Sequence, residues 1–156
     1  MTRAGIGYDI HRLAADRRLV LGGVAIEHPT GLVGHSEGDV LLHALMDALL
    51  GAANLGDLGR HFPSEDPAYA GVSSLGLLKR VGALVREAGF AVSSLDATVI
   101  AQAPRLAPHV GAMRDAIAGA LGVESGRVSV KATTNDGLGV VGSAEAIAAL
   151  AIALLD

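Results

Sequence analysis

Three side chains in the first part of the chain have the types and spacing of a metal site. Asp9 and His11 are two positions apart, so on a β-strand both project from the same face. His43, within the apolar run 40–50, supplies a second imidazole. One carboxylate and two imidazoles leave the fourth tetrahedral position of a zinc ion open, as in catalytic zinc sites. The chain contains no cysteine, which excludes a closed thiolate zinc site and a cysteine nucleophile.

Each of these residues also has an ordinary structural interpretation. A lone histidine in an apolar helix usually bonds a backbone carbonyl, and Asp9-x-His11 alone is a weak motif. Asp47 follows His43 by four residues, on the same helix face, where it could orient the imidazole. The combination of the three candidate ligands is better evidence for a metal than any one of them.

Two further segments carry groups suited to phosphate. His35 and Ser36 precede an expected helix, whose positive N-terminal end favours an anion, although Ser36 or Asp39 could equally be a plain N-cap. The segment 131–139 offers a lysine, hydroxyls and a carboxylate, which could hold a diphosphate and a magnesium-like ion. It lacks the glycine and lysine spacing of a P-loop.

Two loops could bind the rest of a substrate. The acidic, proline-containing segment 57–67 is either a rigid solvated connector or a wall that accepts hydrogen bonds from hydroxyl groups. The segment 101–107 follows an expected strand and opens a helix. It is either an ordinary turn or a loop whose backbone groups bind the edge of a nucleobase.

The hydrophobic pattern predicts the elements that must position these groups. Strands are expected at 3–8, 18–26 (with a Gly-Gly turn), 92–101 and 128–133. Helices are expected at about 40–53, at 74–88 with Ser74 as N-cap, from Pro108 to Leu121, and at 143–155, the last apolar nearly all round and therefore buried. This alternation favours an α/β fold, an α+β sandwich with helices on one face of a single sheet and a partner subunit on the other.

Composition narrows the class of protein. A chain of 156 residues predicts a single domain, 1–156, and 51% hydrophobic residues suggest apolar surface buried between identical subunits. The net charge of −4 argues against a nucleic-acid partner. The N-terminus enters a strand pattern at once, and no apolar run could span a bilayer, so we expect a cytoplasmic protein with no membrane association.

In their order along the chain, these motifs resemble the 2-C-methyl-D-erythritol 2,4-cyclodiphosphate synthases of the non-mevalonate isoprenoid pathway. The matching motifs are Gly5-x-Gly7-x-Asp9-x-His11, His35-Ser36-x-Gly38-Asp39, Asp47 to Ala52, Ile100 to Pro104, and Lys131 to Thr134. The resemblance covers essentially the whole chain. It implies cyclisation of 4-diphosphocytidyl-2-C-methyl-D-erythritol 2-phosphate, in which the 2-phosphate attacks the β-phosphorus and CMP leaves.

The resemblance also implies a homotrimer, with three sheets packed around the axis and an active site at each subunit interface. It assigns Zn²⁺ to Asp9, His11 and His43, a second ion (Mg²⁺ or Mn²⁺) to Asp136, and transition-state contacts to His35 and Thr134. It assigns substrate contacts to Ser36, Asp57, Leu58, Gly59, Phe62, Pro63, Ser64, Glu65 and Asp66. It assigns the cytidine to the neighbouring subunit, through Ala101, Gln102, Ala103, Pro104, Arg105, Leu106, Ala107, Thr133, Thr134, Asn135 and Asp136.

The sequence departs from the family pattern at four positions. Asp136 replaces an expected glutamate, and Ser64 stands where an aspartate is common. Val140 and Ser143 replace the Phe and Arg that line the central cavity of the trimer in the family. We therefore expect catalysis to be retained and isoprenoid diphosphates to bind weakly or not at all.

Two alternatives remain open. A zinc-dependent phosphohydrolase would use the same three ligands to activate water, and a trimeric isoprenoid-diphosphate binder would need no catalysis. The products separate these alternatives, because a cyclase releases CMP with a cyclic diphosphate and a hydrolase releases an open monoester.

Overall fold

The computed structural model describes residues 1–34 and 36–156 as a mixed five-stranded sheet, a small two-stranded hairpin and helices. The sheet order is β4-β1-β7-β5-β6. Its strands are β1 (Arg3–Ala15), β4 (Thr30–Leu32), β5 (Val92–Ile100), β6 (Val128–Thr133) and β7 (Ala146–Leu155), and the hairpin pairs β2 (Leu19–Leu21) with β3 (Val24–Ile26). The α-helices are α1 (Val40–Ala52), α2 (Leu58–His61), α3 (Ser74–Glu87), α4 (Val110–Leu121) and α5 (Gly139–Gly142). Short 3-10 turns are η1 (Pro67–Tyr69), η2 (Ala107–His109) and η3 (Ser125–Arg127).

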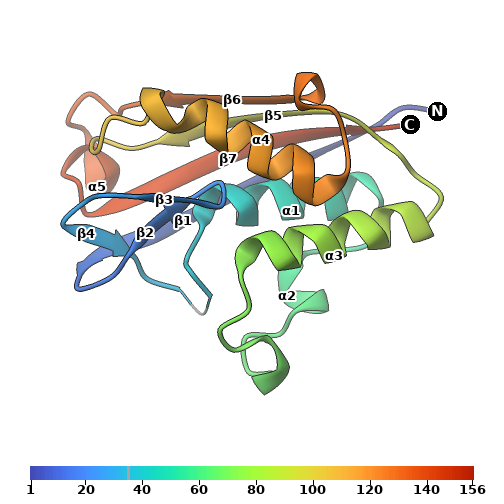
Figure 1. Cartoon of the computed structure of the whole chain (residues 1–156), viewed down its shortest axis with the longest axis horizontal. Helices are drawn as coiled ribbons and strands as arrows, with labels where there is room; N and C mark the ends of the chain where they lie inside the picture. The colour runs from blue at the N-terminus through green and yellow to red at the C-terminus, as the bar shows by residue number, and fades with distance from the viewer. Residues whose placement is uncertain (35) are drawn as a thin grey trace.

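The long helices form one layer against the sheet (Figure 1). Helix α1 packs on β1 and β7, α4 packs on β6, and α3 lies against both α1 and α4. The predicted α/β fold with helices on one sheet face is confirmed. In the part of the chain that the structure describes, no helix is both long and apolar enough to cross a membrane.

The predicted last helix, 143–155, is wrong: this segment is mainly the central strand β7. It pairs antiparallel with β1 on one side and with β5 on the other. Both of its faces carry apolar side chains, so the alternation that marks a strand is missing, and a continuous apolar run cannot be told from a buried helix by periodicity. Its many alanines, which favour helices in isolation, allow α1 to lie close to the sheet.

Several boundaries were predicted correctly and one cap was not. The Gly22-Gly23 turn joins β2 to β3 with positive φ at both residues, and α4 ends at Gly122 in the left-handed conformation. Asp39, not Ser36, caps α1 by accepting the N–H of Leu42. Helix α3 is capped by Ser73 and not by Ser74, and strand β1 extends well beyond 3–8 to include the candidate ligands.

Glycines bring β1 into direct contact with the backbone of α1. A Cβ atom at Gly7 would lie 1.9 Å from the carbonyl oxygen of Ala44, and one at Gly5 would lie 2.0 Å from that of Ala48. Any side chain at these positions would push the helix off the strand. This close approach sets the distance between Asp9 on β1 and His43 on α1.

The opposite face of β1 and β7 is apolar and exposed in the single chain. We call it the outer sheet face. Because Gly5 and Gly7 face α1, the alternate side chains of β1 must face away from the helices. The register places Tyr8 opposite Leu150 and Ile6 opposite Ile152. The large exposed side chains of this face are Ile6, Tyr8, Ile10, Leu150 and Ile152. An apolar face of this size is typical of a surface that a partner covers.

Candidate functional site

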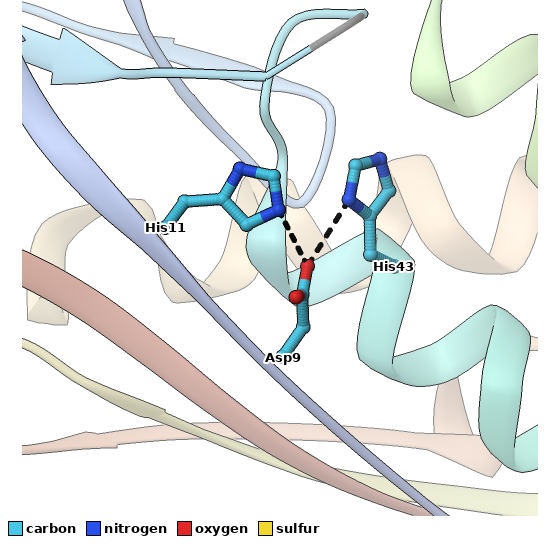
Figure 2. A group of neighbouring side chains, drawn as sticks. All are labelled: Asp9, His11 and His43. Carbon is cyan, nitrogen blue, oxygen red and sulfur yellow. Dashed lines mark hydrogen bonds and ion pairs between the residues drawn. The ribbon is translucent and has the colours of Figure 1, made fainter. Parts of the chain in front are cut away.

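The three predicted metal ligands converge on one point (Figure 2). Asp9 and His11 come from β1 and His43 comes from the first turns of α1. Asp9 Oδ2 lies 2.8 Å from His11 Nε2 and 3.1 Å from His43 Nδ1, and the three ligand atoms all lie within 4.8 Å of one another. The predicted convergence is confirmed, and the donor set fits a divalent cation such as zinc.

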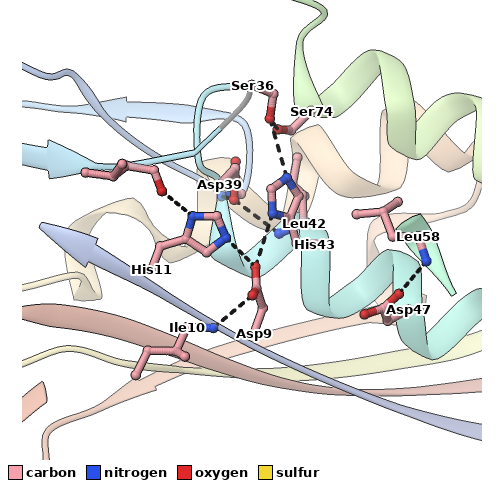
Figure 3. A network of polar contacts seen from close by, with 12 residues as sticks. Asp9, Ile10, His11, Ser36, Asp39, Leu42, His43, Asp47, Leu58 and Ser74 are labelled. Carbon is pink, nitrogen blue, oxygen red and sulfur yellow. Dashed lines mark hydrogen bonds and ion pairs between the residues drawn. The ribbon is translucent and has the colours of Figure 1, made fainter. Parts of the chain in front are cut away.

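The outer nitrogens of the two imidazoles have different partners (Figure 3). His11 Nδ1 lies against the carbonyl oxygen of Val33, which can only accept, so this nitrogen carries the proton and Nε2 is left to bind an ion. His43 Nε2 lies 3.4 Å from Ser36 Oγ, a hydroxyl that can donate or accept. The carbonyl fixes the tautomer of His11, as outer partners of metal-binding histidines commonly do, whereas the hydroxyl allows either tautomer of His43.

The charges at the site also fit a cation. Burial raises the pKa of Asp9, but hydrogen bonds and positive charge from His11 and His43 outweigh it and lower the pKa to about 2. The hydrogen bond to Asp9 raises the pKa of His11 against the effect of burial. The carboxylate therefore attracts positive charge to the point where the ligand atoms meet, and a metal ion would replace a proton there.

A buried carboxylate fixes the start of α1. Asp39 is fully buried and accepts N–H groups from Leu42 at 3.1 Å, Gly22 at 3.0 Å and Gly23 at 2.8 Å. Burial raises its pKa to about 6, and the three N–H donors oppose that rise. Because His43 follows one turn later, this contact ties the position of the imidazole to the β2–β3 turn.

Asp47 does not have the predicted role of orienting His43. Its Oδ1 atom instead accepts the backbone N–H of Leu58 at 2.8 Å (Figure 3), and burial raises its pKa. Asp47 therefore joins α1 to the first residue of α2. The spacing of four residues does place Asp47 and His43 on the same face of α1, but the chain after α1 brings the N–H group of Leu58 into hydrogen-bond distance of Asp47.

The loop beneath His11 is held by an arginine. Arg17 donates from Nε to the carbonyl of Leu32 at 2.9 Å and from Nη2 to that of Gly34 at 3.3 Å. Gly34 lies against the ring of His11, since a Cβ atom there would be 3.0 Å from Nδ1. Sequence reasoning missed both residues. His35 lies outside the described residues, so its predicted role stays a prediction.

A cavity of about 460 Å³ opens beside the metal site. It brings together most of the predicted substrate residues. Asp57 and Asp66 are not in its lining; Asp57 is the N-cap of α2 and Asp66 is the N-cap of η1. Tyr69 and Phe62 form an edge-to-face pair, with ring centroids 5.2 Å apart, in its wall. The sequence contains only two Tyr and two Phe. The occurrence of Phe62 and Tyr69 close together in the sequence was therefore a signal that could have identified Tyr69 as a residue of this cavity. The predicted residues in the lining are Ser36, Leu58, Gly59, Phe62, Pro63, Ser64 and Glu65.

The predicted nucleotide residues form a separate cavity of about 290 Å³. Gln102 Oε1 accepts the N–H of Gly137 at 3.2 Å and so joins the two segments that build this region. Thr134 lines the cavity, but the next two residues, Asn135 and Asp136, are not in the lining. The backbone N–H of Asp136 donates to Thr134 Oγ1 at 3.2 Å. The two cavities have no lining residue in common. The lining is Ala101, Gln102, Ala103, Pro104, Arg105, Leu106, Ala107, Ala132, Thr133 and Thr134.

Comparison with known proteins gives consistent results. The sequence model of the YgbB family matches residues 2–156. A protein of Trichlorobacter lovleyi named 2-C-methyl-D-erythritol 2,4-cyclodiphosphate synthase is 56% identical over 153 residues, which are 98% of this chain and 98% of that protein. A protein of Desulforudis audaxviator named bifunctional enzyme IspD/IspF is 58% identical over 151 residues, and the match covers 97% of this chain and only 38% of that protein.

Solved structures share the fold. The bifunctional IspDF from Campylobacter jejuni superposes with a TM-score of 0.95 at 42% identity, over 99% of this chain and 42% of that one. IspF of Plasmodium falciparum, in a complex with CDP, superposes with a TM-score of 0.86 at 32% identity, over 99% of this chain and 95% of that one.

Proposed function

We propose that this chain, which belongs to the YgbB family, cyclises 4-diphosphocytidyl-2-C-methyl-D-erythritol 2-phosphate to 2-C-methyl-D-erythritol 2,4-cyclodiphosphate with release of CMP. The observation that carries the proposal is the convergence of Asp9, His11 and His43 beside a cavity walled by the predicted substrate residues. Relatives over 50% identical and nearly equal in length bear the name of this synthase. We place the reaction in the cytoplasm, with the whole of 1–156 as one catalytic domain and the phosphorus–oxygen lyase class as its chemistry.

The reaction needs positioning and charge neutralisation more than acid–base chemistry. A phosphate dianion is already a nucleophile, so the protein must fold the substrate until its 2-phosphate meets the β-phosphorus. Asp9, His11 and His43 would hold a zinc ion, which when bound polarises the β-phosphate as a Lewis acid. Leu58 and Gly59, at the start of α2, would face the erythritol, because Asp47 and Asp57 hold the start of that helix.

We assign the diphosphate to the second cavity and its neighbourhood. Asp136 would bind Mg²⁺ or Mn²⁺ on the diphosphate, since such ions prefer oxygen ligands shared with phosphate. The contact between Thr134 and Asp136 supports this, because it holds a hydroxyl next to the carboxylate. His35 and Thr134 would make the transition-state contacts. The segment 101–107 would bind the cytidine through its backbone.

A homotrimer would complete the site. In one chain the metal site and the proposed nucleotide cavity are lined by different residues. A substrate that contacts both must therefore either extend from one cavity to the other within the chain or bind between two copies of the chain. The outer sheet face supports the second copy, since it leaves Ile6, Tyr8 and Ile152 uncovered. Packing three such sheets around an axis would bury these side chains and let the neighbour supply the cytidine pocket.

The proposal is tested by following phosphorus NMR signals of the substrate during incubation with the protein and zinc. We expect CMP and a cyclic diphosphate, and no turnover by His43→Ala with the fold retained. An open monoester would instead support the zinc-dependent phosphohydrolase. A complete absence of turnover, with isoprenoid diphosphate bound tightly, would support the non-catalytic binder.

A further inference from the structure

Ser74 is a buried hydroxyl that α3 does not use for its own cap. Ser73 is the N-cap and accepts the N–H of Gly76 at 3.1 Å. The next residue, Ser74, is 0% exposed, and its Oγ lies 3.1 Å from Ser36 Oγ. A buried hydroxyl without a hydrogen-bond partner is costly, and Ser36 supplies a partner for Ser74. Because Ser73 already caps α3, the helix does not need this contact for its own start.

Ser36 lies between Ser74 and the metal site (Figure 3). Its Oγ is 3.1 Å from Ser74 Oγ and 3.4 Å from His43 Nε2. A second contact fixes the same junction, because the N–H of Ser74 donates to Glu37 Oε2 at 3.3 Å. Ser74 is not in the lining of the cavity, so any effect that it has on the site passes through Ser36.

The direction of these hydrogen bonds decides which nitrogen of His43 can bind an ion. A hydroxyl donates one proton and accepts through two lone pairs. When Ser36 donates to Ser74, it can only accept from His43, so Nε2 keeps its proton. An ion can then replace the proton that the other nitrogen, Nδ1, donates to Asp9, 3.1 Å away, because Nε2 holds the proton that remains on the ring. When Ser36 donates to Nε2 instead, Nδ1 carries the proton and cannot bind a metal.

The two histidines therefore differ in how their tautomers are set. His11 faces the carbonyl of Val33, which accepts and cannot reverse. His43 faces a hydroxyl, which can reverse, and it needs a further residue to choose the direction.

We propose that Ser74 is a positioning residue for the metal site: it accepts the proton of Ser36 and so keeps His43 in the tautomer that presents Nδ1 to the ion. The inference rests on the metal site of the proposed function and does not depend on which reaction the site catalyses. Loss of a group that hydrogen-bonds a metal ligand directly, as Ser36 does to His43, lowers metal affinity by roughly 10- to 100-fold in other metalloproteins.

The test compares zinc affinity, measured by competition with a chromophoric chelator, in the full-length protein and in Ser74→Ala, Ser36→Ala and the double variant. We expect each single change to weaken zinc binding by about tenfold or more, and the double variant to bind no more weakly than Ser36→Ala. Two-bond ¹⁵N–¹H spectra of the imidazoles should show less Nε2–H tautomer of His43 in Ser74→Ala. Ser74→Cys, which is slightly larger than serine and offers only a weak acceptor, should show the same changes and serves if the alanine variant does not fold.

Ser73→Ala is the matched control, since it removes the neighbouring hydroxyl and the cap of the same helix. It should lower the melting temperature and leave zinc affinity and the His43 tautomer unchanged. Wild-type affinity and tautomer in Ser74→Ala would overturn the proposal, as would losses that add in the double variant. A wild-type protein that binds no zinc would overturn the metal site itself, which separates that failure from a failure of Ser74 alone.

Discussion

Gly7→Ala should separate β1 from α1 and damage the metal site without changing any ligand. The added Cβ would lie 1.9 Å from the carbonyl oxygen of Ala44 and 2.9 Å from the nitrogen of Ala48. Carbon and oxygen atoms in contact need roughly 3.4 Å, so the strand and helix must move apart locally by about 1.5 Å. Overpacking of this kind costs roughly 1–3 kcal/mol of the free energy of unfolding.

The same movement acts on zinc because Asp9 and His43 stand on the two separated elements. A ligand distance tolerates only about 0.2 Å, so a shift of more than 1 Å should weaken zinc binding by about tenfold or more. Urea unfolding of the metal-free protein and chelator competition measure the two effects, both at one protein concentration because the proposed assembly would add to stability.

Gly51→Ala is the control, because Gly51 lies in the same helix with nothing within 4 Å of the Cβ position. It should leave zinc affinity unchanged and raise the free energy of unfolding by roughly 0.5–1 kcal/mol, as alanine favours a helix over glycine. Wild-type stability and zinc affinity in Gly7→Ala would refute the argument that the glycine contact sets the geometry of the site.

Three further changes test other parts of the molecule. Ile152→Lys places a charge on the outer sheet face and should give monomers by sedimentation, with loss of cyclisation; an oligomeric state equal to that of the unmodified protein would exclude this face as the interface. Arg17→Ala removes the hydrogen bonds to the carbonyls of Leu32 and Gly34 and should weaken zinc binding several-fold in chelator competition, while Arg18→Ala should not. Equal losses of zinc affinity in the two variants would show that Arg17 acts only through its positive charge. Ser143→Arg should create or strengthen farnesyl diphosphate binding in calorimetry, and tight binding by the unmodified protein would contradict the role given to arginine.

The residues of the metal site could be predicted from the sequence because strand geometry alone brings two of them together. Alternation places Asp9 and His11 on one face for any strand that contains them, and the apolar helix with His43 had to cover that face. What could not be predicted is the partner of each side chain. Asp47 has the right spacing to reach His43, yet it bonds the N–H of Leu58, since the path of the chain after α1 has no signal in local spacing.

The error over the last element has a physical origin of the same kind. Residues 146–155 show no period of two because α1 covers one face of β7 and the outer sheet face provides apolar neighbours on the other. The apolar excess of this segment was assigned to a helix, and its link to assembly stays a prediction. Only the pairing with β1 and β5 identifies the strand, and pairing between distant segments is set by the tertiary fold.

Strand β1 links the metal site to the apolar outer sheet face through its own alternation. The residues that face α1 are Gly5, Gly7, Asp9 and His11, and those between them face the opposite side as Ile6, Tyr8 and Ile10. A shift of this strand by one residue would exchange the two sets and remove both the metal site and the apolar face. The pairing of ten consecutive residues of β1 with β7 makes such a shift costly. The same register therefore holds the ligands toward the cavity and leaves the outer sheet face free for the proposed neighbouring subunit, so a change of register should be detected in both zinc affinity and oligomeric state.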